Sequence, residues 1–95
     1  MAADPQAVTR AAAIAERVQR ETRDRALRIS LVMRETARTL ERTAALAEEH
    51  ARRRDRVGGE GAVQERQAAE RAREAARRAR RYAQQWRDVA DGGQP

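Results

Sequence analysis

The stretch that decides the fold is residues 62–90, AVQERQAAERAREAARRARRYAQQWRDVA. It contains no Gly and no Pro, and from Ala69 onward small or apolar residues recur at alternating steps of three and four. This spacing lines one face of an α-helix and is typical of a helix that packs against another helix. The recurring residues are Ala69, Ala72, Ala76, Ala79, Ala83, Trp86 and Ala90. We therefore predict a packed helix here, because a disordered basic chain would not show such phasing.

The sequence before this stretch predicts a longer helix and a tight turn. Residues 6–56 hold no Gly or Pro, and Asp4 followed by Pro5 is a favourable helix start. Glycines gather in residues 57–61, VGGEG, the one internal stretch that would break a helix. We expect a single domain with a helix over about 5–56, a turn at 57–61 and a helix over about 62–91. The predicted fold class is all-α, a long antiparallel helical hairpin that resembles a coiled coil.

The two predicted helices also match in register. The first carries an apolar seam with the same alternating steps, formed by Ala26, Ser30, Met33, Ala37, Leu40, Ala44, Ala47 and Ala51. With the turn centred near Gly59, Ala79 falls near Leu40, and Trp86 falls beside Val32 and Met33. We therefore expect Trp86 to anchor the core opposite Met33.

Two features predict self-association into a homodimer. At 1.5 Å per residue the first helix would span about 78 Å and the second about 43 Å, so roughly the first twenty residues lack a partner. This overhang carries Val8, Ile14 and Val18. The stretch 27–33 is apolar on most sides, so it too needs cover from more than one neighbour. A dimer forming a four-helix bundle would cover both features, whereas the alternative is a break near Thr22 that folds the first helix back as a third helix.

The expected core and oligomer interface follows from these two arguments. It consists of Ile14, Val18, Leu27, Leu31, Val32, Met33, Leu40 and Trp86.

Arginines concentrate on the predicted second helix. Arg66, Arg73, Arg80 and Arg87 recur every seven residues beside the seam, and from Arg66 to Arg87 eight arginines face only two acidic residues along the sequence. Such a stripe suits phosphate backbones, as in proteins that bind nucleic acids without sequence preference. The other interpretation is a solvated coiled-coil flank that pairs with Glu41, Glu48 and Glu49 of the first helix or with acidic residues of another subunit. The candidate phosphate contacts are Arg66, Arg73, Arg77, Arg80, Arg81 and Arg87.

The composition leaves little room for enzyme chemistry. The chain has 95 residues with 22 Ala and 21 Arg, a bias typical of long helices. His50 and Ser30 are the single His and the single Ser, and there is no Cys, so nucleophiles, bases and metal ligands are scarce. We expect no catalytic residue, no metal and no cofactor. Because the sequence has no apolar run of about 18 residues and no apolar leader, we expect a cytoplasmic protein outside the membrane.

Residues 34–54, RETARTLERTAALAEEHARRR, and 64–80, QERQAAERAREAARRAR, resemble small Ala/Arg-rich helical proteins of actinobacteria, which are commonly uncharacterised. The resemblance is compositional and covers much of the chain. It implies a helical hairpin and no particular activity. The length is also similar to that of secreted WXG-type hairpins, but the turn here is Val57-Gly58-Gly59 without their Trp-x-Gly.

These features bear on three possible functions. The sequence favours a non-enzymatic, self-associating helical interaction module that scaffolds or regulates a protein partner. The alternative is a nucleic-acid-binding protein that uses the Arg stripe of the second helix. An enzyme is the least favoured, because the chemistry-bearing residues are so few.

Overall fold

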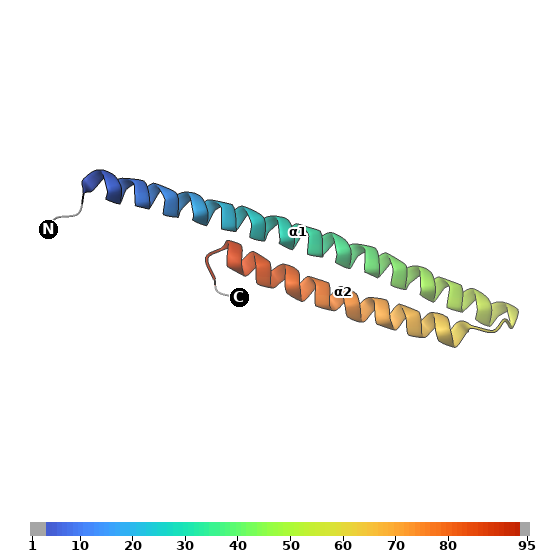
Figure 1. Cartoon of the computed structure of the whole chain (residues 1–95). Coiled ribbons are helices and arrows are strands. Elements are labelled where there is room, and N and C mark those ends of the chain that lie inside the picture. The colour runs from blue at the N-terminus through green and yellow to red at the C-terminus, as the bar shows by residue number, and fades with distance from the viewer. Residues whose placement is uncertain (1–3, 94–95) are drawn as a thin grey trace.

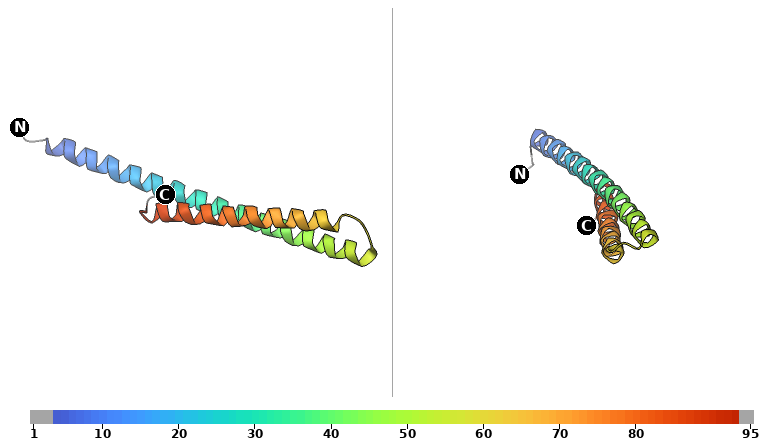
Figure 2. Two further views of the ribbon diagram at one scale, coloured as in Figure 1. Left: turned by 90° about the horizontal axis from the view of Figure 1, so that it is seen from below. Right: turned by 90° about the vertical axis from the view of Figure 1, so that its right-hand side faces the viewer.

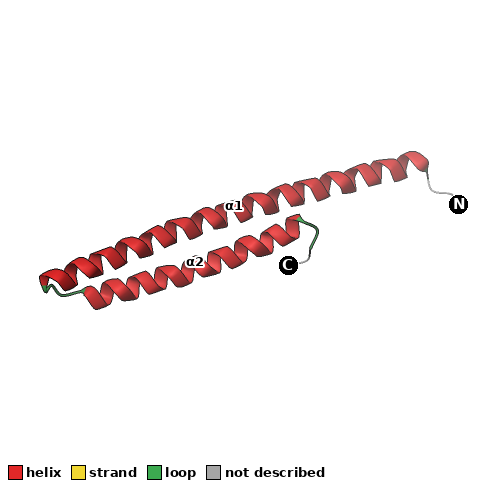
Figure 3. Ribbon diagram, turned by 180° about the vertical axis from the view of Figure 1, so that it is seen from behind, coloured by secondary structure: helices red, strands yellow, loops and turns green. Residues whose placement is uncertain are grey.

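The protein is an antiparallel hairpin of two helices of unequal length (Figure 1). The computed structural model describes residues 4–93, in which α1 is Pro5–Val57 and α2 is Ala62–Ala90. The hairpin is a thin rod with principal extents of 85 × 15 × 14 Å. No strand occurs among the described residues (Figure 3). The predicted all-α hairpin is confirmed, and each predicted helix end differs from the observed one by no more than one residue.

Local capping interactions fix where α1 begins and ends. At its start the Asp4 carboxylate accepts a hydrogen bond of 3.0 Å from the backbone N–H of Gln6, and Pro5 occupies the first turn. At its end Gly58 is left-handed with φ 70°, a conformation that favours Gly because it has no Cβ. The guanidinium of Arg54 then donates a 2.8 Å hydrogen bond to the Glu60 carbonyl, which braces the loop.

The core between the helices is made almost entirely of Ala methyl groups. No large side chain is fully buried among the described residues. Two clusters of buried alanines lie along the seam, and partly buried Leu40 packs beside Ala79 in one of them, as the register predicted. The buried alanines are Ala26, Ala37, Ala44, Ala47, Ala51, Ala62, Ala69, Ala72, Ala76, Ala79, Ala83 and Ala90. Such small side chains allow the two helix backbones to approach closely, but each buries little apolar area.

One polar side chain is buried in the seam and ties the helices together. Ser30 is 2% exposed, and its Oγ donates a 2.8 Å hydrogen bond to the carbonyl of Ala83 on α2. The hydroxyl is therefore satisfied although it lies away from water. This bond specifies the longitudinal register of the hairpin in a way that methyl contacts alone cannot.

Helix α1 continues through Thr22 without a break, so the alternative with a third helix is wrong. Figure 2 shows α1 extending well beyond the C-terminal end of α2. All described residues from Asp4 to Arg25 are exposed. The predicted overhang is thus confirmed, and within the hairpin nothing covers it.

The prediction that Trp86 anchors the core of the hairpin is wrong. Its side chain is 38% exposed and lies at the rim of the seam. The physical reason is the small size of the other seam residues, because helices packed on Ala methyls leave no room between them for an indole ring. Whether Trp86 contributes to a subunit interface stays a prediction.

Candidate functional site

One flank of the hairpin is a regular ladder of ion pairs between the helices. Arg66 pairs with Asp55, Arg73 with Glu48, and Arg80 with Glu41. Each rung is seven residues from the next on both helices, and in the middle rung the Arg73 Nη1 to Glu48 Oε1 distance is 3.0 Å. This is the pairing expected on one edge of an antiparallel coiled coil. Arg73 and Glu48 are also the least exposed pair of the three, with side chains 39% and 25% exposed.

The remaining candidate phosphate contacts also have carboxylate partners. Arg77 lies 2.7 Å from Glu74 and Arg81 lies 3.8 Å from it, while Arg87 lies 3.5 Å from Asp91. The hydrogen bond and charge of Arg77, with the charges of Arg78 and Arg81, lower the pKa of the Glu74 carboxyl below its ordinary value.

All six predicted phosphate contacts are therefore ion-paired within the hairpin. The predicted partners Glu41 and Glu48 are confirmed, but the predicted pairing of Glu49 with α2 is wrong. Glu49 lies 2.7 Å from Arg53, one turn later in its own helix. The basic stripe is thus an intramolecular flank whose charge is largely balanced, and this balance counts against its use as a phosphate-binding surface.

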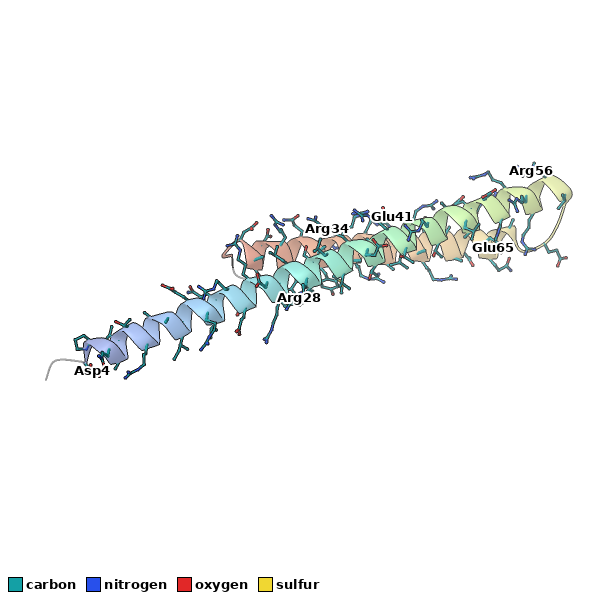
Figure 4. All side chains as sticks on the ribbon, turned by 90° about the horizontal axis from the view of Figure 1, so that it is seen from above. Asp4, Arg28, Arg34, Glu41, Arg56 and Glu65 are labelled. Atoms are coloured by element: carbon teal, nitrogen blue, oxygen red, sulfur yellow. The ribbon has the colours of Figure 1, made fainter. Side chains whose placement is uncertain are left out.

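The ladder has a mismatched fourth rung. The pattern of the first three rungs sets Arg87 opposite Arg34, which brings two like charges to the same level. Arg34 lies one heptad before Glu41 on the same side of α1, whereas Arg28 projects from a different side (Figure 4). Arg87 instead pairs with Asp91 in its own helix, and no carboxylate lies within 4.0 Å of Arg34 in the described part of the chain.

Changing Arg34 to Glu should complete the ladder and stabilise the hairpin. We expect a gain of about 0.5–1 kcal/mol, since a repulsion between half-buried Arg34 and exposed Arg87 is replaced by an ion pair. Thermal unfolding followed by circular dichroism measures it. Arg20→Glu is the matched control, because Arg20 lies in the same column two heptads earlier, beyond the end of α2, and should change stability little. Equal effects of the two changes would contradict the assigned rung.

A second feature of the surface is the large apolar side chains that the hairpin leaves uncovered. Their exposed fractions are 55% for Val8, 52% for Ile14, 52% for Val18, 62% for Leu31 and 58% for Val32. Of the predicted interface residues, Leu27, Met33 and Leu40 are partly buried, and the other five are exposed. The structure therefore divides the predicted interface residues into three that are partly buried between the helices and five that are exposed.

Four further exposed apolar residues were not among the predicted interface residues. Leu46 and Tyr82 are each 52% exposed, Val57 is 81% exposed and Val63 is 63% exposed. For Leu46 the available signal was the interval of fourteen residues, or two heptads, between Val32 and Leu46, which places both on one side of α1.

A shallow groove forms where α2 ends against the overhang. It is lined by Val18, Gln19, Thr22, Arg23, Val89, Ala90, Asp91 and Gly92. Val18 and Thr22 belong to the line of residues, four apart, that leads from Ile14 into the α2-facing seam at Ala26. At this groove the line of residues from Ile14 to Ala26 therefore changes from exposed positions to positions covered by α2.

No set of three or more His, Asp or Glu side chains could hold a metal ion between residues 4 and 93. Neither described helix is both long and apolar enough to cross a membrane.

Comparison with known proteins gives no matching family model, no matching curated protein and no matching solved structure.

Proposed function

We propose that the protein is a non-enzymatic, self-associating helical interaction module of the cytoplasm, which forms a homodimer and scaffolds or regulates a protein partner. The observation that carries the proposal is a contrast between core and surface. The hairpin buries Ala methyls inside, while larger apolar side chains such as Leu31, Val32 and Leu46 remain exposed outside. Because burial of apolar area drives association, the larger gain is available between molecules.

The size of the chain supports the same proposal. A small two-helix unit buries a low fraction of its surface and commonly needs an additional source of stability, such as oligomerisation. Here the core contributes only methyl-sized groups, each worth about 0.8 kcal/mol when buried. A dimer that forms a four-helix bundle would add the exposed Leu and Val side chains to a shared core.

The overhang of α1 supports a protein partner in addition to the dimer. Val8, Ile14 and Val18 form an exposed apolar face on a preformed helix, and amphipathic helices of this kind bind grooves or other helices. By comparison, the six arginines of the nucleic-acid alternative already have carboxylate partners.

Sedimentation equilibrium of the purified full chain tests the proposal. We expect a dimer at micromolar concentration that persists at 0.5 M salt, because burial of exposed apolar side chains, and not ion pairing, supplies the association. A folded monomer up to 100 µM would rule out self-association. Titration with double-stranded DNA at low salt tests the nucleic-acid alternative. We expect no binding tighter than that of an unrelated basic coiled coil.

A further inference from the structure

Helix α1 carries a second heptad stripe along nearly its whole length. Its residues alternate at steps of three and four, as in the α2-facing seam. Between Val8 and His50 only one of them, Arg25, is charged. The stripe consists of Val8, Ala11, Ala15, Val18, Thr22, Arg25, Ile29, Val32, Thr36, Thr39, Thr43, Leu46 and His50. A stripe with this spacing is the pattern by which one helix packs along another.

The stripe is separate from the seam that binds α2. Each stripe residue from Arg25 to His50 directly precedes a seam residue in the sequence. Because an α-helix turns by about 100° per residue, the stripe lies roughly a quarter-turn around α1 from the seam. Its central side chains are open, since Val32 is 58% and Leu46 is 52% exposed and Thr36, Thr39 and Thr43 are exposed as well. In a four-helix bundle each helix contacts two neighbours in directions about a quarter-turn apart, and this is the geometry that the two stripes provide.

The threonines of the stripe suit a helix–helix contact. The Thr43 hydroxyl donates a 3.0 Å hydrogen bond to the carbonyl of Thr39, so its polar group is satisfied within α1 and needs no water. A shallow groove on this face is lined by Val32, Glu35, Thr36, Thr39 and Leu40. The groove is thus lined mainly by uncharged side chains, with Glu35 at its border, and a side chain of another helix can enter it.

A column of alternating charge borders the stripe on the side away from α2. Every seventh residue of α1 reverses sign in the order Glu21, Arg28, Glu35, Arg42, Glu49 and Arg56. All six are exposed, with Glu35 61% and Arg42 68% exposed. Within α1, Arg42 lies 3.7 Å from Glu35 and Arg53 lies 2.7 Å from Glu49, so pairing with a second copy would exchange these contacts for intermolecular ones. Charged residues at this heptad position determine which helix binds as the partner and in which direction it runs.

This column is complementary to itself when two copies run antiparallel. In one register Glu21 faces Arg56 of the second copy, Arg28 faces Glu49, and Glu35 faces Arg42. The two-fold axis repeats each pair, so all six positions meet an opposite charge. A shift by one heptad sets like charges together, for example Glu35 against Glu35. In a parallel dimer the column faces the uncharged seam column that contains Met33 and Leu40, so no charges pair.

We infer that the second stripe of α1 binds a second copy of the chain, with the two α1 helices antiparallel and Glu35 opposite Arg42. This inference rests on the proposed self-association and specifies its surface and direction. The two α1 helices then overlap along residues 20–57, and residues 5–19 of each copy extend beyond the overlap at opposite ends. The ladder of Arg66, Arg73 and Arg80 stays on the outside. Exposed ion pairs fix direction and register more than they add affinity, and the apolar stripe supplies the association.

Reversal of the charge column tests the surface. One variant carries Glu21→Arg, Glu35→Arg and Glu49→Arg, and the other carries Arg28→Glu, Arg42→Glu and Arg56→Glu. Each alone should self-associate at least tenfold more weakly than the natural chain, and an equimolar mixture should form a heterodimer visible by native mass spectrometry. The mixture is its own control, because a variant that lost only its fold would not be restored by the other. Unchanged self-association of both variants would overturn the inference.

Cysteine cross-linking tests the direction, because the chain has no Cys of its own. In the inferred register Val32 lies opposite Thr43 of the second copy. A mixture of Val32→Cys and Thr43→Cys chains should therefore give the mixed disulfide, and Val32→Cys alone should give none. A dimer that cross-links Val32→Cys to itself overturns the antiparallel direction while self-association stands. A dimer without either disulfide overturns the face, and a monomer overturns the proposed function along with this inference.

Discussion

Replacing Ala37 with Leu is expected to destabilise the hairpin by about 1–3 kcal/mol, because the added carbons have no space between the helices. Ala37 is 0% exposed and packs in a cluster with Ala76 and Ala79. The larger side chain must push the helix backbones apart, which also lengthens the 2.8 Å hydrogen bond from Ser30 to the Ala83 carbonyl two turns away. Urea unfolding followed by circular dichroism measures the change.

The matched control for this prediction is Ala45→Leu. Ala45 is exposed on the same helix, so the identical substitution should change stability by less than 0.5 kcal/mol, the range typical of surface positions. Leu is also a good helix former, so neither substitution weakens α1 itself. If Ala37→Leu were as harmless as Ala45→Leu, the helices would not be packed closely on Ala methyls.

The thermal unfolding midpoint of the natural chain should rise with protein concentration. Folding coupled to dimerisation gains about 1.4 kcal/mol for each tenfold increase in concentration, by mass action. For two chains of this size, that gain corresponds to roughly 3–6 °C per tenfold. Scans from 2 to 200 µM by circular dichroism and calorimetry measure the shift.

Leu46→Glu provides the comparison for the concentration series. Leu46 is 52% exposed and lies outside the seam that contacts α2, so we expect the substitution to leave the isolated hairpin intact. The thermal unfolding midpoint of this variant should be lower than that of the natural chain and nearly independent of protein concentration. A natural chain whose midpoint stays constant over the same hundredfold range would show that the hairpin is stable as a monomer.

Much of the fold was predictable because its signals are local. Glycines in 57–61 interrupt two runs that hold neither Gly nor Pro, and Asp4-Pro5 starts the first run. Helix boundaries therefore depended on capping and backbone preference, which act within a few residues. The register was predictable to within about one turn, since the two seams have the same period and a short turn leaves few alternatives.

Side-chain exposure and ion pairing were less predictable, because the distance between the two helices cannot be derived from the sequence alone. Trp86 shares the period of the seam, and its large apolar side chain made it the expected anchor. The Ala residues around it bring the backbones together and force the ring to the rim, where it is 38% exposed. In the same way Glu49 was expected to cross to α2, but Arg53 lies one turn away on its own helix and pairs with it.

The sequence by itself determined two helices of unequal length, their antiparallel pairing and the overhang of α1, since periodicity and glycine placement act along the chain. Only the tertiary structure decided which charges are balanced and which apolar side chains remain open. It paired the arginine stripe with Asp55, Glu48 and Glu41, and it covered one stripe of α1 while leaving another exposed. The physical reason is that pairing and exposure depend on the separation and rotation of the helices, which only their packed seam sets.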